Sequence, residues 1–70
     1  MSLQQTLWIR QGKNKRPYFL HKINKNKQEL ITEAKKKYGK TKYFFVKLYN
    51  AKKKQEEYAL YLNRIVHYEQ

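Results

Sequence analysis

Hydrophobic and aromatic positions are densest over residues 41–49, TKYFFVKLY, and their alternation predicts a β-strand. Successive side chains of a strand point to opposite faces. One face carries Phe44, Val46 and Leu48, which require a hydrophobic core. The other face carries Tyr43, Phe45, Lys47 and Tyr49. We expect this strand to be the central strand of a sheet.

The face with the aromatic rings and Lys47 has two interpretations. If it is open, it suits nucleic acid, because bases stack on aromatic side chains and phosphates pair with ammonium groups. If a helix covers it, the same rings form the other half of the core. The sequence favours the open face.

Two shorter β-prone runs precede this strand, at residues 7–11 and 18–23. The residues between them, 12–17, include the turn formers Gly, Asn and Pro. The two runs therefore predict a hairpin, with Pro17 at the beginning of the second strand. The side chains of that strand expected to point inward are Phe19, His21 and Ile23. Those on its opposite face are Tyr18, Leu20 and Lys22.

A helix is predicted over residues 27–38. Asn26 followed three residues later by Glu29 is typical of a helix start, where side chains satisfy free backbone N–H groups. Gly39 is expected to supply a left-handed cap at the other end. The last turn carries cations that suit the helix dipole, namely Lys35, Lys36 and Lys37. The apolar stripe consists of Leu30, Ile31, Ala34 and Tyr38.

The tail fits two structures. Residues 51–57, AKKKQEE, have helix-forming composition, and apolar positions between residues 58 and 68 lie near helical spacing, so a helix is favoured. However, Tyr58, Leu60 and Leu62 also alternate. Residues 52–55 can then be a hairpin loop before a fourth strand.

The sequence as a whole, residues 1–70, predicts one small basic α+β domain with an antiparallel sheet. The favoured order is ββαβα with three strands, and the alternative is ββαββ with four. A domain of this length buries about 60% of the surface that its unfolded chain exposes, so its stability is expected to be marginal unless it oligomerises.

The charge is large and segregated. Lys and Arg number 17 against five acidic residues, all Glu, which gives a formal net charge of +12. Residues 10–54 hold sixteen of the cations and two Glu, whereas residues 55–70 hold one Arg and three Glu. This segregation is typical of a binding surface beside a structural tail, and a polyanionic partner would relieve the self-repulsion.

The composition also bears on disulfides, metal sites, cellular location and membrane contact. Without cysteine the chain forms no disulfide and no thiolate zinc site, and an intracellular location such as the cytoplasm is the simpler expectation. No metal or other cofactor is predicted. The sequence shows no signal peptide and no apolar stretch that approaches bilayer-spanning length, so no membrane contact is expected.

The favoured function is a non-enzymatic nucleic-acid-binding protein. Fourteen Lys against three Arg favour phosphate contacts over bidentate base reading, so binding of DNA or RNA is expected to be largely sequence-independent. The predicted phosphate contacts are Arg10, Lys13, Lys15, Arg16, Lys35, Lys36, Lys42 and Lys47. The predicted stacking residues are Tyr43 and Tyr49. Trp8 and Tyr18 flank the basic hairpin and are candidate stacking faces, but Trp8 is expected in the core, as a lone tryptophan of a small domain usually is.

Residues 43–48, YFFVKL, resemble in part the aromatic strand signature of RNA-recognition motifs, where alternating exposed aromatics and a Phe-Val pair follow a basic residue and Gly. Lys42 occupies the Gly position, Phe44 that of a small residue and Leu48 that of an aromatic. The chain is also short for the βαββαβ fold. The resemblance therefore implies only that aromatic rings are exposed on one face of a sheet.

Two other functions fit the composition. A small adaptor or inhibitor would bind an acidic protein, or form a homodimer, through an apolar and aromatic patch in the tail. That patch would consist of Tyr58, Tyr61, Leu62 and Ile65. A toxin-type, metal-independent ribonuclease would use His21 and His67 as acid and base, although no spacing of these residues supports catalysis.

Overall fold

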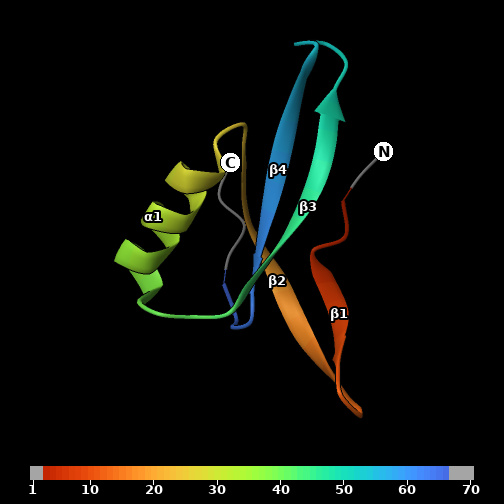
Figure 1. Ribbon diagram of the computed structural model, residues 1–70, viewed down its shortest axis with the longest axis vertical. Helices are drawn as coiled ribbons and strands as arrows, with labels where there is room; N and C mark the ends of the chain where they lie inside the picture. Colours follow the sequence, from red (N-terminus) through yellow and green to blue (C-terminus); the bar gives the residue numbers. More distant parts are fainter. Residues whose placement is uncertain (1–2, 67–70) are drawn as a thin grey trace.

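The computed structural model describes residues 3–66, which form one small domain of a curled four-stranded antiparallel sheet and one helix (Figure 1). The elements in chain order are β1 (Thr6–Gln11), β2 (Asn14–Asn24), α1 (Lys27–Tyr38), β3 (Tyr43–Asn50) and β4 (Gln55–Leu62). The strand order is β1-β2-β4-β3. The arrangement is therefore ββαββ, and the favoured ββαβα order is wrong.

The tail forms strand β4 where a helix was favoured. Four consecutive residues of β4 are buried, from Ala59 to Leu62, because β4 lies between β2 and β3 and packs on both faces. A strand buried on both faces loses the alternation of apolar and polar residues, so its sequence imitates helical spacing. Asn50 Oδ1 accepts a hydrogen bond from Lys53 N at 3.2 Å within the β3–β4 loop.

The strand predicted to be central is an edge strand. β3 pairs with β4 alone, so its outer edge has no neighbouring strand within the described chain. Val46 and Leu48 pack on the core as expected. Phe44, expected to point inward with them, is 41% exposed. β4 takes the central place.

Each face of the sheet has its own buried cluster. On the helix side, the cluster consists of Leu30 and Ala34 from α1 with Leu60 and Leu62 from β4. On the other side, it consists of Tyr18, Leu20, Ala59 and Tyr61. The N-terminal segment anchors across this second cluster, because Gln5 O accepts a hydrogen bond from Leu20 N at 2.8 Å and Gln4 O accepts one from the Tyr61 hydroxyl at 2.7 Å. Tyr18 and Leu20 are therefore core residues, contrary to expectation.

A β-bulge interrupts the pairing of β2 with β4. Leu20 lies opposite Tyr61 and Lys22 lies opposite the next residue, Leu60, so His21 is an extra residue without a partner in the register. The bulge ends the strict alternation on which the predicted inward set depended. Ile23 consequently packs in the cluster away from the helix.

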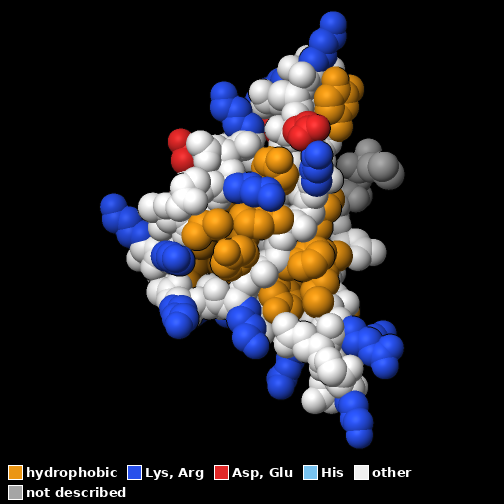
Figure 2. Space-filling model, in the orientation of Figure 1, with side chains coloured by type: hydrophobic (Ala, Val, Ile, Leu, Met, Phe, Trp, Pro, Cys, Tyr) orange, Lys and Arg blue, Asp and Glu red, His pale blue; other side chains and the backbone are white. Residues whose placement is uncertain are grey.

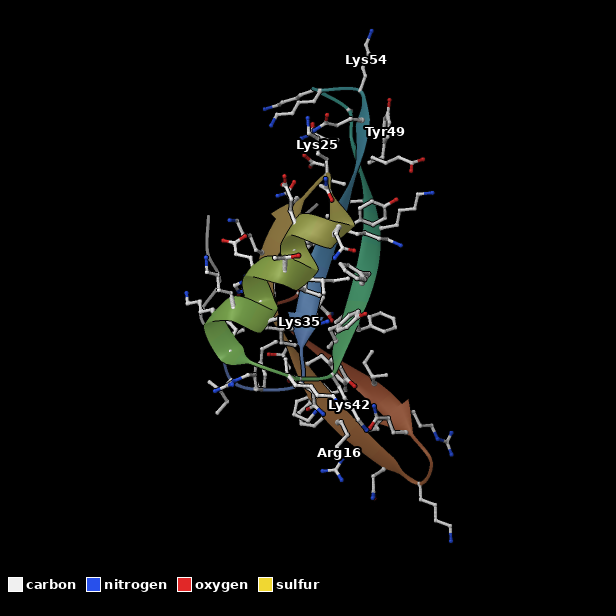
Figure 3. All side chains as sticks on the ribbon, turned by 60° about the vertical axis from the view of Figure 1, so that its left-hand side comes forward. Arg16, Lys25, Lys35, Lys42, Tyr49 and Lys54 are labelled. Atoms are coloured by element: carbon white, nitrogen blue, oxygen red, sulfur yellow. The ribbon has the colours of Figure 1, made fainter. Side chains whose placement is uncertain are left out.

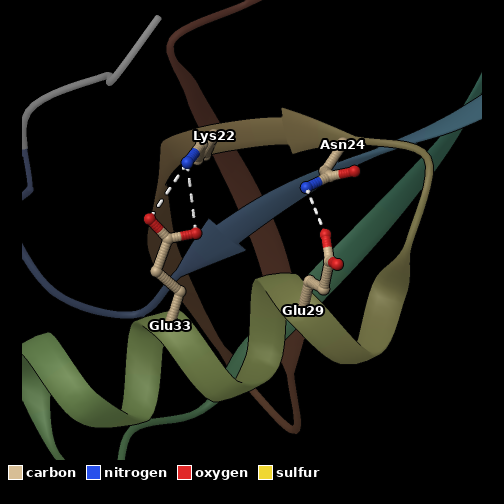
Figure 4. A network of polar contacts seen from close by, with 4 residues as sticks. All are labelled: Lys22, Asn24, Glu29 and Glu33. Atoms are coloured by element: carbon tan, nitrogen blue, oxygen red, sulfur yellow. Dashed lines mark hydrogen bonds and ion pairs between the residues drawn. The ribbon is translucent and has the colours of Figure 1, made fainter.

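Two consecutive side chains at the bulge, His21 and Lys22, both face α1. The His21 ring is fully buried and meets the Tyr38 ring edge-on, with 5.5 Å between centroids. Lys22 Nζ donates to both carboxylate oxygens of Glu33, at 2.9 and 3.1 Å (Figure 4). These hydrogen bonds lower the pKa of Glu33, which keeps the pair charged.

Helix α1 has the predicted bounds and the predicted N-cap, whereas Gly39 ends the helix in a conformation that differs from the predicted left-handed cap. Asn26 Oδ1 accepts a hydrogen bond from Glu29 N at 3.2 Å. The Glu29 carboxylate turns to β2, where it accepts a hydrogen bond from Asn24 Nδ2 at 3.1 Å (Figure 4). Gly39 N donates to Lys35 O at 2.8 Å, with φ 76° and ψ −157°. This conformation has the expected positive φ but lies outside the left-handed helical region, and it is open mainly to glycine.

His21 makes stability depend on pH. Burial lowers the pKa of His21 below its ordinary value of 6.5; Lys37 and Lys22 act in the same direction, and Glu33 opposes them. The folded protein then binds fewer protons than the unfolded chain below pH 6.5, so the free energy of unfolding should fall as pH falls from 6.5 to about 5.5, by at most about 1.4 kcal/mol per pH unit. Urea denaturation across this range measures it.

Two variants test whether His21 causes this pH dependence: His21→Leu removes the buried ring, and His67→Gln is the control at the other histidine. Neither ring nitrogen of His21 has a hydrogen-bond partner among residues 3–66, so His21→Leu should change the free energy of unfolding at pH 7 by no more than about 1 kcal/mol and should abolish the slope. His67→Gln should keep it. If the free energy of unfolding of His21→Leu still falls between pH 6.5 and 5.5, the pH dependence does not come from His21.

Candidate nucleic-acid interface

The outer part of the β1–β2 hairpin is a two-stranded ribbon that projects beyond the helix (Figure 1). β1 pairs only with β2, and β2 pairs with β4 only from Phe19 onward. The residue pairs from Leu7–Tyr18 to Gln11–Asn14 therefore have no third strand beside them in the described chain. Five such pairs span roughly 17 Å. We call this part the ribbon.

The ribbon is more regular than predicted. A two-residue turn of Gly12 and Lys13 closes it, with Gly12 at φ 62°, so the predicted loop over residues 12–17 is too long. Pro17 lies inside β2, opposite Trp8, and not at the beginning of the strand. It is tolerated because this part of β2 pairs on one side only.

Four of the predicted phosphate contacts are exposed on the ribbon. They are Arg10 on β1, Lys13 in the turn, and Lys15 and Arg16 on β2. The side chains of Lys13, Lys15 and Arg16 contact no partner among residues 3–66. Arg10 Nε donates a long hydrogen bond of 3.4 Å to Gly12 O. The fold thus brings these four predicted cations together on the ribbon, and no acidic side chain of the described chain neutralises them.

Two of these cations oppose each other directly. Arg10 and Lys15 are cross-strand partners, so their Cβ atoms lie about 4.5–5.5 Å apart on one face of the ribbon. Like charges in this arrangement destabilise a hairpin. The chain therefore keeps a pair of cations at a position where the free protein loses stability, and an anion placed between them would reverse the sign of the interaction.

Trp8 lies on the same face of the ribbon, two residues from Arg10. It is 63% exposed, so the expectation that it would be buried in the core is wrong. Helix α1 packs on β2 and β4, and the ribbon lies beyond that cover. Sequence reasoning considered Trp8 as a stacking residue because it flanks the basic hairpin, but it favoured burial and so left Trp8 out of the predicted site.

A second basic group surrounds the end of α1. It contains the predicted residues Lys35, Lys36 and Lys42, all exposed. Arg64, which the sequence assigned to a structural tail, joins it: its Nη1 donates to Tyr38 O at 3.0 Å, and its guanidinium carbon lies 5.0 Å from the centre of the Tyr38 ring. Arg64 thereby satisfies a carbonyl at the negative end of the helix dipole.

The face of β3 that turns toward the helix is covered in its middle and open at its ends. Phe45 packs in the helix-side core, and Lys27 Nζ lies 5.4 Å from its ring centre. Tyr43 and Tyr49 are 47% and 66% exposed, but they lie about 20 Å apart along the strand. Lys47 forms an exposed ion pair with Glu56 at 3.2 Å.

The predicted residues do not form one patch. Arg16 and Lys42 lie toward one end of the molecule, whereas Tyr49 and Lys54 lie at the opposite end (Figure 3). The long dimension is 38 Å. Figure 2 shows cations around the rim of one face, with apolar side chains at its centre. The ribbon and the end of α1 therefore form the candidate interface, and Lys47 and Tyr49 lie outside it.

Of the two histidines predicted for a ribonuclease, His21 is fully buried beneath the helix, and His67 falls outside the described residues. Residues 3–66 bring no three His, Asp or Glu side chains together as a metal site. In the same part of the chain, α1 is too short and too polar to cross a membrane.

Comparisons with protein-family models, with curated proteins and with solved structures find no match to this chain. The partial resemblance of residues 43–48 to RNA-recognition motifs gains no support from the fold either. The ββαββ order differs from βαββαβ, and the aromatic strand is at an edge of the sheet.

Replacing Lys15 by Gln tests the opposed cations. Lys15→Gln should stabilise the free protein in dilute buffer by up to about 1 kcal/mol, and about 1 M salt should remove most of the gain. Thermal or urea unfolding at both salt concentrations measures it. Lys25→Gln, at an exposed cation outside the ribbon, lowers the net charge equally. An equal gain in Lys25→Gln would show that overall self-repulsion, and not the cross-strand pair, is responsible.

Proposed function

We propose that this protein is a non-enzymatic nucleic-acid-binding module that contacts the sugar–phosphate backbone with little sequence preference. One observation carries the proposal. Residues 3–28 contain seven Lys and Arg and no acidic residue, and four of these cations stand on the projecting ribbon. The four ribbon cations have no acidic partner among the described residues, and the phosphates of a polyanion supply the counter-charge.

The kind of cation supports backbone contact over base reading. Lys is a point charge that pairs with a phosphate in many orientations, and Lys outnumbers Arg by fourteen to three. The exposed cations at the end of α1 provide a second contact region beside the ribbon. An extended polymer reaches both regions, which a compact anion does not.

Binding should weaken steeply with salt. If the seven predicted cations of the ribbon and the α1 group each neutralise one phosphate, the slope of log affinity against log salt approaches −6 for duplex and −5 for a single strand, at about 0.9 and 0.7 per phosphate. Fluorescence anisotropy of labelled oligonucleotides measures both slopes. A flat dependence, or no binding in dilute buffer, removes the proposal.

Two variants of equal charge localise the interface. The ribbon variant replaces Arg10, Lys13, Lys15 and Arg16 by Gln. The control variant replaces Lys25, Lys52, Lys53 and Lys54 by Gln. The ribbon variant should lose most of the affinity and about 3–4 units of the duplex slope, whereas the control should lose little. Equal losses would show that net charge alone governs binding.

A second candidate is self-association, at a different surface from the one the sequence indicated. Tyr61 and Leu62 of the predicted tail patch are buried inside β4, so that patch does not exist as a surface. Within residues 3–66 the outer edge of β3 is unpaired over its eight residues; the strand contains no Pro or bulge, and its only cation is Lys47. Such an edge is a template for another strand.

A second copy of β3 fits this edge in register. Antiparallel pairing centred on Val46 opposes Tyr43 to Tyr49, and Phe44 to Leu48, with no like charges face to face. Lys47 then lies opposite Phe45 and keeps its ion pair with Glu56. The result is one continuous eight-stranded sheet, with a ribbon at each outer end.

Light scattering tests the dimer. In about 0.5 M salt, which screens the net charge, the mass should rise from 8.7 kDa toward twice that value with increasing concentration. Phe44→Lys should keep the protein monomeric, and Ile65→Lys, at another exposed position, should not. A wild-type protein that stays monomeric at high concentration and high salt would rule out the dimer.

A further inference from the structure

We infer that Trp8, Arg10 and Lys15 form a binding site for one unpaired nucleotide, with the base stacked on the indole and a neighbouring phosphate held between the two cations. The inference rests on the proposed nucleic-acid function and narrows its ligand to single-stranded DNA or RNA. It assigns a role to two features that fold stability does not explain, namely an exposed tryptophan and a pair of opposed cations.

The three side chains share one face of the ribbon. Trp8 and Arg10 are two residues apart on β1, about 7 Å along the strand, and Lys15 lies directly across from Arg10. All three are exposed, and no acidic residue occurs between residues 3 and 28 to compete for the cations. A ligand on this face meets an aromatic plane and two positive charges at once.

The indole provides the contact to a base. It is 63% exposed, and among residues 3–66 it makes no ring or cation contact that would cover it. An apolar ring of this size left in water is a source of binding free energy, and stacking of one base on an aromatic side chain accounts for a roughly 5- to 150-fold gain in affinity.

The two cations provide the contact to phosphate. Arg10 uses its Nε for the long bond to Gly12 O, so its terminal amino groups still point to no partner in the described chain. A guanidinium and an ammonium that converge on one anion exchange mutual repulsion for two charge-assisted hydrogen bonds. The cross-strand register places the two side chains opposite each other on one face of the ribbon.

The same geometry disfavours duplex at this site. Bases in a duplex are already stacked and paired, so an indole reaches a base face only after that base is unpaired and displaced from the stack, which costs free energy. Phosphate contacts are available from either substrate. Trp8 is therefore the side chain that separates single strands from duplex.

Because Trp8 is the only tryptophan, its fluorescence reports on the site directly. We would titrate the protein with a single strand of about 12 nucleotides, with the duplex of the same sequence, and with inorganic polyphosphate, in the same dilute buffer. The single strand should quench the fluorescence at the concentrations where labelled-strand anisotropy saturates. The duplex should bind more weakly with little quenching, and polyphosphate should bind without quenching.

Variants separate the ring from the charges. Trp8→Ala should lower single-strand affinity about 5- to 150-fold and duplex affinity little, with Trp8→Phe in between, as measured by anisotropy. Ile65→Ala, at an exposed apolar side chain outside the ribbon, should leave affinity unchanged. Replacing Arg10 and Lys15 by Gln should reduce the single-strand salt slope by about 1.4. Circular dichroism checks that each variant is folded.

The outcomes distinguish the site from the function. Binding seen by anisotropy with unchanged tryptophan fluorescence, and with wild-type affinity in Trp8→Ala, overturns the nucleotide site and leaves the proposed function intact. Quenching by polyphosphate equal to that by the single strand overturns base stacking. No binding to either oligonucleotide overturns the proposed function and the site together.

Discussion

One helix covers only one face of a four-stranded sheet, and the rest of the structure follows from that constraint. α1 has 12 residues, about 18 Å of length, and packs on β2 and β4. The second face is closed by the curl of the sheet and by the N-terminal segment, which is held at Gln4 by the Tyr61 hydroxyl. Burial there raises the pKa of Tyr61. β4 thus becomes the element that both cores share.

The cations divide into those that the fold uses and those that it does not. Lys22 pairs with Glu33, Lys27 lies over the rings of Phe45 and Tyr58, and Arg64 closes the end of α1. The ribbon cations Lys13, Lys15 and Arg16 have no such contacts in the described chain. In a small domain with a limited core, these uncompensated cations lower stability through self-repulsion.

Local chemistry was predictable from sequence, and three-dimensional neighbours were not. The Asn26 cap, the bounds of α1 and the first hairpin depend on residues close in the chain, and the sequence predicted them. Residues 55–62 needed knowledge that they lie between two strands, because double-sided burial erases the alternation that marks a strand. The bulge at His21 likewise has no sequence signal, and it changes which side chains face the helix.

The candidate site was found in part for the same reason. Charge is additive along a chain, so the basic hairpin was visible in the sequence. The exposure of Trp8 and the cation–π contact of Arg64 with Tyr38 depend on where α1 ends in space. Lys47 was assigned to phosphate without knowledge of its cross-strand neighbour Glu56.

The ribbon has a consequence for motion. Its outer pairs are Arg10–Lys15 and Gln11–Asn14. In these pairs β1 and β2 bond only to each other, and the pairs lie far from the helix-side core. Backbone amides there should open to solvent without disturbing β2 and β4 further in, so hydrogen exchange would be fastest at this tip. A ligand that contacts both strands would reduce this local opening. Part of its binding free energy would then be used to order a tip that opens transiently in the free protein.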